Sequence, residues 1–599
     1  MTKHRGLCSL LATALLMTAN PVPALARVYA PRVVAVGQPD PQSAITFLTH
    51  AAWKDLPAEE RAEAIGKFLF DPANGLQVTA ESPFAGTDPR SEHHLIRDPL
   101  QLWNVYGAAS PEALSAAVAA LWDVSGPGRA QVLFDPRTDR WAAAIPTGTG
   151  SRLFVPGGGE FIVAPDLQPR YSQGVAQYTR DLVLRRGETF TAWFNPQGDR
   201  WRLDPAWLKD KSQKARLLQP PAGPKILDDD RTAVRRGNGL FVYEPQLQGD
   251  AADFVDGVLT SRNLKITDAG LTLDSAGDGF VVFAVETPFV IVPELGDIAD
   301  PKDDREASVV EVDGAGLTAA WSPDAGATWI SLETKEFPAK LDLTKEVAGR
   351  SGYLLRLNLK GKPGQAVVKS FRVSTWVQLA PGALPAIRPG ENAFSLKTRD
   401  HDGLESLPLV VEANGPDENE FLKYAIRPPR ELNPADSQRR AVGPFSLRIP
   451  ARPGTQIAWL SVAASLSADS DENQTARLGL ATDRPAGFVA QDLPRLPGDH
   501  NHWHYQFLSD VRLDQPAETV YLQLEGRPAL NAYRIVAHCI PRETQPASRL
   551  QVTHRWREAG VEKESAHELE EGANYQVVAG DQIENVAVEY RVAGGRPPR

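Results

Sequence analysis

The chain has 599 residues, of which 42% are hydrophobic and 23% are charged, so it is long enough for several domains and has the composition of folded globular protein. Its formal net charge of −11 argues against a nucleic acid or an anionic lipid surface as partner. The 49 prolines and 47 glycines are typical of many short strands joined by turns, so we expect helix to be the minority element.

The N-terminus has the pattern of a secretory signal peptide over residues 1–26. A basic start at Lys3 and Arg5 precedes an apolar run over 7–17 and a small-residue end at 24–26. Cleavage after Ala26 would remove two cations and no acid, which takes the net charge from −11 to −13. No later segment is apolar over the length that spans a bilayer, so the sequence predicts a secreted or periplasmic protein without a membrane span.

The chain has two cysteines, of which Cys8 lies in the signal peptide and Cys539 in the apolar stretch AHCIP. An intramolecular disulfide is therefore not expected in the mature chain. The apolar setting predicts that Cys539 is buried as a small hydrophobic side chain and does not act as a nucleophile.

The N-terminal domain is predicted to begin with two helices over 42–70, with Pro57 at the head of the second. Another helix is predicted to start at Ser110, because serine is a good N-cap and Pro111 fits the first helical position. The apolar stripe of this helix is Leu114, Val118, Leu121 and Trp122. The apolar pieces 129–134 and 141–145 then predict a strand hairpin around the turn-rich DPRTD.

Residues 104–141 thus run from Tyr106-Gly107 through a helix that ends in AALW to a pair of strands. This order resembles the core of the transglutaminase-like, papain-related superfamily, in particular large secreted bacterial proteins in which a cysteine opens the helix. The resemblance implies an α+β fold for this domain. In active members it also implies a thiolate at the helix N-terminus and a histidine base on a following strand.

The positions that match this cysteine are Ala109, Ser110 and Pro111, and none of them is a thiol. No histidine occurs between His94 and His401, so no nearby strand supplies the base. We therefore expect a degenerate transglutaminase-like domain that does not catalyse, in which Ser110 caps the helix.

Beyond this domain the sequence predicts mainly antiparallel β-sandwich domains, from short alternating apolar runs with turn signals between them. The charged stretch 562–572 is expected to be a solvated connection. The predicted division is a signal peptide at 1–26, the degenerate α+β domain with following strands at 27–218, a linker at 219–236, a β-sandwich at 237–380, a linker at 381–392, a second β-sandwich at 393–545, and C-terminal strands and tail at 546–599.

Within the first predicted sandwich, the sequence SPDAGATW at 322–329 matches the Asp-box of sialidases and other β proteins. In that motif Asp324 and Gly326 form a hairpin turn, while Trp329 packs below it. The motif is structural in nearly every setting, and a sialidase is expected to repeat it on several blades. One copy indicates an extracellular, often glycan-associated β architecture without identifying an activity.

A polar cluster in DHNHWHYQF places His500, His502 and His504 on one face of a predicted strand. Alternate residues of a strand lie roughly 6.6 Å apart, so two of these imidazoles could share Zn²⁺, Cu²⁺ or Ni²⁺ with a ligand from another strand. Alternatively the histidines form a polar strand face, or Tyr505 stacks on a sugar ring. Acidic loops elsewhere leave room for a Ca²⁺ site, although no EF-hand spacing is present.

From these features we expect a secreted, non-catalytic multidomain protein that binds a glycan or a protein at the cell envelope. One alternative is a polysaccharide-active hydrolase or lyase with a site among the β domains that involves the three histidines. Another is a purely structural surface protein. Paired catalytic carboxylates are defined by their separation in space, which the sequence does not give.

Overall fold

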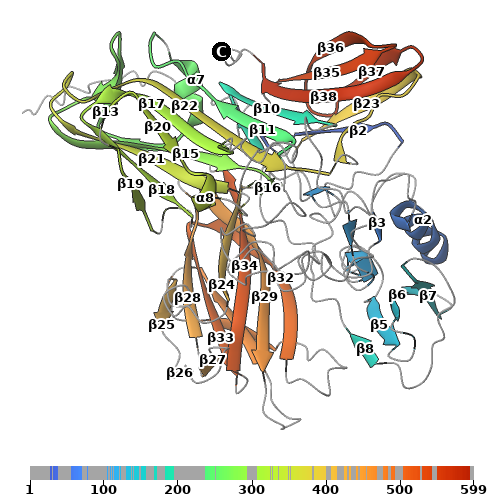
Figure 1. Cartoon of the computed structure of the whole chain (residues 1–599). Helices are drawn as coiled ribbons and strands as arrows, with labels where there is room; N and C mark the ends of the chain where they lie inside the picture. The colour runs from blue at the N-terminus through green and yellow to red at the C-terminus, as the bar shows by residue number, and fades with distance from the viewer. Residues whose placement is uncertain are drawn as a thin grey trace, which may run out of the picture.

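The computed structural model shows a mainly β protein built from many antiparallel sheets, with few helices among the described residues (Figure 1). It describes residues 27–37 except 30, 56–70, parts of 77–156, 168–170, 182–194, 237–292 except 250, 306–398 with short gaps, 407–467 and 476–492 with gaps, 504–541 except 527–528, and 549–593. No helix among these residues is long and apolar enough to cross a membrane.

Two sheets face each other across one core and form what we call the first sheet pair. The first of them has five strands in the order β12 (Val258–Arg262), β15 (Gly277–Glu286), β21 (Gly352–Gly361), β18 (Leu317–Ser322) and β19 (Ile330–Leu332). The facing part of an 11-stranded sheet consists of β11 (Gly239–Tyr243), β13 (Leu264–Thr267), β14 (Gly270–Leu273), β16 (Val290–Ile291), β17 (Ser308–Ala315), β20 (Ala339–Asp342) and β22 (Val367–Gln378). Two short helices, α7 (Ala252–Gly257) and α8 (Thr344–Val347), lie in the connections.

Aromatic rings from both sheets meet in the middle of this core. The ring of Phe283 on β15 lies 5.6 Å from that of Tyr243 on β11 and 4.6 Å from that of Phe371 on β22. Such contacts between large buried rings stabilise the packing of two sheets beyond the area that they bury. Around them, the alternating apolar residues of each strand supply the rest of the core.

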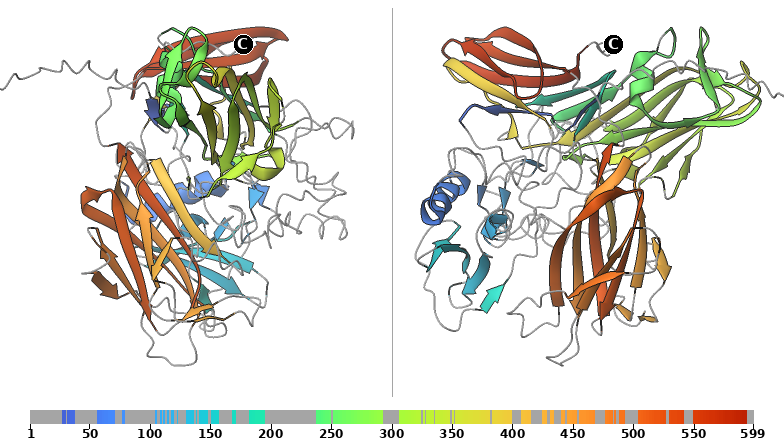
Figure 2. Two further views of the ribbon diagram at one scale, coloured as in Figure 1. Left: turned by 90° about the vertical axis from the view of Figure 1, so that its left-hand side faces the viewer. Right: turned by 180° about the vertical axis from the view of Figure 1, so that it is seen from behind.

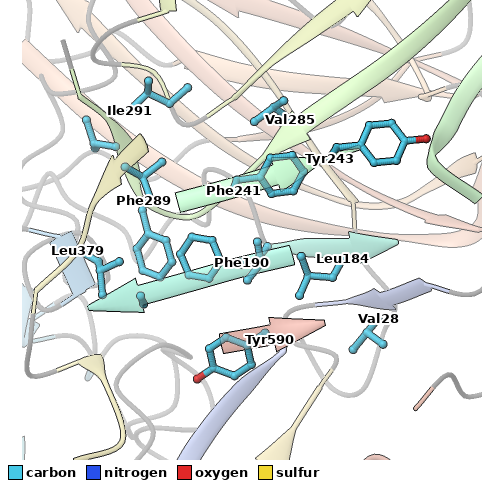
Figure 3. Close-up of a cluster of buried hydrophobic side chains, with 14 of the residues drawn as sticks. Val28, Leu184, Phe190, Phe241, Tyr243, Val285, Phe289, Ile291, Leu379 and Tyr590 are labelled. Atoms are coloured by element: carbon cyan, nitrogen blue, oxygen red, sulfur yellow. The ribbon is translucent and has the colours of Figure 1, made fainter. Parts of the chain in front are cut away.

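The 11-stranded sheet continues into the C-terminal strands. β10 (Glu188–Trp193) pairs with β11 on one side and with β38 (Ile583–Val592) on the other, and the order goes on through β35 (Leu550–Glu558) to β36 (Val561–Leu569). Figure 3 shows Phe190 of β10 between Phe289 and Tyr590, with ring centroids 5.5 and 6.5 Å away. One sheet therefore contains strands 188–193, 239–243 and 583–592, which the linkers predicted from the sequence would place in separate domains.

Smaller sheets complete this part of the molecule. One has the order β2 (Arg32–Ala35), β23 (Gly390–Lys397) and β37 (Asn574–Ala579), and its rings contact the C-terminal strands, since the Phe394 and His554 rings are 4.9 Å apart. Another pairs β1 (Arg27–Tyr29) with β9 (Val183–Arg185).

A second sheet pair has its own core (Figures 1 and 2). One of its sheets contains β24 (Leu407–Asn414), β26 (Glu431–Asn433), β27 (Arg440–Val442), β29 (Thr455–Ser467), β32 (His504–Ala517) and β34 (Ala529–Pro541). The other contains β25 (Ala425–Arg427), β28 (Phe445–Pro450), β30 (Ala476–Ala481), β31 (Val489–Asp492) and β33 (Thr519–Gly526). Alternating apolar residues such as Phe445, Leu447 and Ile449 on β28 build this core.

The N-terminal region contains the longest helix described, α2 (Ala58–Phe70), which confirms the second of the two helices expected over 42–70. The carbonyl oxygen of Pro57 accepts the Arg61 N–H at 2.8 Å, so the helix begins where the sequence predicts it. The first of those helices lies outside the described residues.

The later helix and hairpin of this region are also confirmed. Pro111 and described residues up to Trp122 are helical, and Leu114, Val118 and Trp122 of the predicted stripe are buried. β5 (Gln131–Asp135) pairs antiparallel with β6 (Arg140–Thr147), as expected from the apolar pieces around DPRTD. β7 (Gly150–Phe154) and β8 (Gln168–Arg170) extend this hairpin to a four-stranded sheet.

The stretch 562–572 is predicted from the sequence to be a solvated connection; it is largely exposed, but residues 561–569 form the strand β36 and are not a connection. Its exposed charges are paired across the strands with β35. Arg555 on β35 contacts Glu564 at 3.1 Å, and Arg549, next to that strand, contacts Glu568 at 3.3 Å. Opposite charges that face each other on neighbouring strands stabilise their pairing. They do so here for β36, whose composition resembles that of a helix.

Candidate functional site

Ala109, Ser110 and Pro111 match the position of the catalytic cysteine in transglutaminase-like proteins, and the structure describes two of the three. Ala109 lies in β4 (Ala108–Ala109), which pairs in parallel with β3 (Gln77–Val78), and Pro111 is helical and half-buried. Ser110 lies outside the described residues, so its predicted role as a cap stays a prediction.

Of the histidine cluster, His500 and His502 lie outside the described residues. The backbone of His504 begins β32, where it pairs with Ser467 of β29, and Tyr505 pairs with Leu466. Within the described part of the chain, no group of three or more His, Cys, Asp and Glu side chains is placed to hold a metal ion.

The Asp-box sequence forms the turn between β18 and β19. The N–H of Gly326 donates to the hydroxyl oxygen of Ser322 at 2.9 Å, and Gly326 has a φ of +90°, which side chains other than glycine rarely adopt. Asp324 lies outside the described residues. The turn delivers Trp329 to the side of the sheet that faces away from the core.

We call this side of the five-stranded sheet the outer face. Strand register places Phe280 of β15 opposite Arg262 of β12 and Asn358 of β21, and Asn358 opposite Thr318 of β18. The next row contains Thr260, Val282, Arg356, Ala320 and Ser331, and the third contains Ala284, Leu354 and Ser322. Burial increases along these rows, from the exposed Arg262 and Thr318 to the buried Ala284 and Leu354.

Four side chains on this face form an alternating series of guanidinium and ring that we call the cation–ring row. The guanidinium carbon of Arg262 lies 5.0 Å from the ring centroid of Phe280. That of Arg356 lies 4.4 Å from Phe280 and 5.4 Å from Trp329. These distances are within the roughly 6 Å at which a cation is attracted to the face of an aromatic ring.

Among the residues that the structure describes, neither Arg262 nor Arg356 has an ion pair or a side-chain hydrogen bond. The Nε of Arg356 is buried without an acceptor. A guanidinium is permanently charged in proteins, so the two arginines hold positive charge with which no acidic residue of the described chain is paired. The cation–ring row is therefore a place where the protein can accept an anionic or strongly polar group.

A second polar cluster lies on the C-terminal strands β35, β36 and β37. Ser565 Oγ and His567 Nε2 are 2.8 Å apart, and the Tyr575 hydroxyl is 2.7 Å from Nε2 of His554. Burial lowers the pKa of His554 to about 4 and that of His567 below its usual value. Within the described chain no carboxylate is hydrogen-bonded to either imidazole, which a catalytic serine–histidine pair requires for orientation. The contacts hold Tyr575 and His554 against Phe394, so we assign them to packing.

Cys539 is fully buried in the second sheet pair, and burial raises the pKa of its thiol. The prediction that Cys539 is buried is confirmed. A protonated thiol without access to solvent is a poor nucleophile, so its lack of reactivity is expected and stays a prediction.

Three members of the cation–ring row were not singled out by the sequence analysis, and Trp329 was expected only to pack below its turn. Arg356 stands in YLLRLNLKG, where strand alternation places it on the side opposite Leu355 and Leu357. An arginine at an alternate position of an apolar strand is a usable signal. Its pairing with Phe280 and Arg262 depends on register between strands far apart in sequence.

Comparisons with known proteins do not assign the chain to a family. No family model matches the sequence, and no curated protein matches it. Among solved structures, dimeric latent PorU from Porphyromonas gingivalis is 10% identical with a TM-score of 0.17, over 54% of this chain and 33% of its own. The ANX1 ectodomain from Arabidopsis thaliana is 9% identical with a TM-score of 0.17, over 45% and 82%. Infectious bursal disease virus Gt strain is 12% identical with a TM-score of 0.15, over 62% and 85%. This chain spans about a third of the length of latent PorU.

Proposed function

We propose that this is a non-catalytic, secreted or periplasmic binding protein that holds a glycan on the outer face of its five-stranded sheet. The observation that carries the proposal is the cation–ring row of Arg262, Phe280, Arg356 and Trp329. Planar guanidiniums and rings present flat surfaces to the C–H faces of a sugar, while N–H groups at the edge of each guanidinium donate to its hydroxyls.

The polar neighbours of this row favour a glycan over a protein as ligand. Thr318 is exposed and Asn358 is half-exposed beside Phe280, and their side chains both donate and accept hydrogen bonds. The apolar residues of the same face, such as Val282 and Leu354, are buried. A protein interface is centred on apolar side chains that lose contact with water on binding, and the exposed part of this face offers few of them.

We further propose that each sheet pair is a β-sandwich domain and that the N-terminal region is a degenerate transglutaminase-like domain. Support for the latter comes from the order of a helix at 111–122 followed by the β5–β6 hairpin, and from the lack of a histidine between His94 and His401. In this proposal the N-terminal domain contributes no chemistry, and binding rests on the β domains.

The proposal is tested with purified protein on a glycan array, with release of reducing sugar measured in parallel. We expect glycan binding without turnover, and loss of most binding in Trp329→Ala and Phe280→Leu. The matched control is Arg388→Gln, which removes an exposed arginine outside the outer face. Circular dichroism checks that each variant is folded.

Three outcomes would contradict the proposal. Released oligosaccharide would show an enzyme, and binding that survives both ring substitutions would place the site elsewhere. A protein ligand bound in place of any glycan would replace the ligand class.

A further inference from the structure

We propose that the outer face recognises glycans that carry carboxylate groups, with Arg262 and Arg356 as the residues that bind the carboxylates. This inference rests on the glycan-binding function proposed above and adds the chemical class of the ligand.

The first support is the lack of acidic partners for these two arginines. The chain has 75 acidic against 64 basic residues, so a nearby carboxylate is the common situation for an arginine. On the C-terminal strands that situation holds, since Arg549 contacts Glu570 at 2.9 Å and Arg557 contacts Glu584 at 3.2 Å. On the outer face, Arg262 and Arg356 have no acidic partner among the described residues, and their guanidiniums lie over rings.

The acidic residues at the two ends of β15 are paired with other cations. Asp278, next to the exposed end, contacts Lys360 at 4.0 Å. Glu286, at the buried end, contacts Arg185 and Arg452. The positive charge of the cation–ring row is therefore not neutralised by the described residues of its own strand.

The second support is the way in which the rings hold the two guanidiniums. Arg356 lies between Phe280 and Trp329, at 4.4 and 5.4 Å from their centroids, and Arg262 lies at 5.0 Å from the same Phe280 ring. An attraction to a ring face fixes the guanidinium plane without removing its charge. A guanidinium that is already oriented loses less freedom when it donates two parallel N–H bonds to a carboxylate.

The order of the four side chains indicates how the ligand lies. Arg262 and Arg356 stand on β12 and β21, on either side of β15, so their strands are separated by roughly 10 Å. A glycan that crosses these strands would present one acidic sugar to each arginine. Nucleic acid would need many more cations, because its affinity depends on the number of phosphates neutralised.

The test uses isothermal titration calorimetry with uronic-acid oligosaccharides, each paired with its methyl ester. The two members of a pair differ only at the carboxyl group, which is charged in the acid and is an uncharged methyl ester in the other member. A sulfated oligosaccharide is included, because sulfate offers the same kind of charged oxygen acceptor. We expect at least one free acid to bind ten times or more tightly than its ester, with the difference falling as salt is raised.

Variants assign that preference to residues. Arg262→Gln and Arg356→Gln are each expected to weaken binding of the free acid by about tenfold and to weaken binding of the ester less, because only the acid loses a charge-assisted bond. Arg262→Lys keeps the charge without the planar fork and is expected to retain part of the preference. Arg388→Gln should bind like the unmodified protein.

The outcomes separate this inference from the proposed function. Equal binding of acid and ester, abolished by Trp329→Ala, overturns the inference and leaves glycan binding in place. Unchanged binding in both Arg→Gln variants, or tighter binding of the sulfated glycan than of every uronate, also overturns it. Absence of binding to any glycan overturns both proposals.

Discussion

Arg185 and Glu286 form a fully buried ion pair, with Nη2 and Oε2 3.2 Å apart, that lies where the two sheet pairs meet. Arg185 also contacts Glu188 at 2.9 Å and donates to the carbonyl oxygen of Ala284 at 2.9 Å, and Glu286 contacts Arg452 of the second sheet pair. Nearby, Val183 of β9 packs in the core of that second pair. The network therefore ties three distant parts of the chain together with charges that are each satisfied by a partner.

Glu286→Gln is expected to destabilise the protein by about 3–5 kcal/mol, because it removes the carboxylate that pairs with both Arg185 and Arg452 in a buried site. Urea unfolding followed by fluorescence measures this loss. Since several domains are present, we expect the second sheet pair to unfold in a separate transition in the variant.

The control for this variant is Lys360→Met, which breaks an ion pair whose side chains are 87% and 67% exposed. An exposed pair contributes about 0–1 kcal/mol, so this change should have little effect. Equal stability of Glu286→Gln and the unmodified protein would show that the network is not needed to join the two parts.

Acid should destabilise the C-terminal strands through His554. Burial lowers the pKa of this histidine from 6.5 to about 4. The unfolded chain then takes up a proton near pH 6.5 that the folded protein accepts only near pH 4, so stability is lost as the pH falls through this window. The full loss is about 3 kcal/mol for this side chain, which is 1% exposed.

His554→Gln removes the titrating group and keeps a donor and an acceptor for the Tyr575 hydroxyl. Thermal unfolding at pH 7 and pH 4.5 should show a smaller difference in this variant than in the unmodified protein. The same acid dependence in both would assign it to other groups, of which His567, with its lowered pKa, is the nearest.

Gly326→Ala is expected to weaken glycan binding, because alanine is strained at the φ of +90° that this turn requires. Strain of about 1 kcal/mol would shift the turn that places Trp329 beside Arg356. The matched change is Gly249→Ala, at a φ of +69° with no atom near the added Cβ and outside the outer face. Calorimetry should show a loss of affinity only for the variant at position 326. Equal affinities of the two variants would show that the turn does not position the binding site.

Cys539 should resist alkylation until the second sheet pair unfolds. Its side chain is fully buried, and burial raises the pKa of the thiol, so both access and thiolate are lacking. Mass spectrometry after iodoacetamide treatment, with and without urea, checks this. Rapid modification of the native protein would contradict the buried position.

Local patterns predict the parts of this fold that depend on neighbours in sequence. The helix stripe of Leu114, Val118 and Trp122, the hairpin at 131–147 and the Asp-box turn all follow from spacing within a few residues. The strand at 561–569 was missed because local spacing does not show its pairing partner. Its charged residues are typical of a solvated segment, and the arginines of β35 that face them are known only from the structure.

The candidate site depends on contacts that sequence spacing does not contain. Arg262, Phe280 and Arg356 come together only when β12, β15 and β21 pair in one register. The partners Arg185 and Glu286 are 101 positions apart. Alternation predicts which side of a strand a residue occupies, but not which strand lies next to it.

The position of β10 between β11 and β38 has a consequence for biogenesis. Thr191 and Glu589, which face each other across this pairing, are 398 positions apart, so a polypeptide that is made N-terminus first can pair β10 with β11 early but with β38 only after that strand has followed. The edge of β10 that pairs with β38 stays without that partner while the chain from Thr191 to Glu589 is completed. This edge would be protected during that interval by a chaperone that covers it, or by a transport route that delivers the chain unfolded.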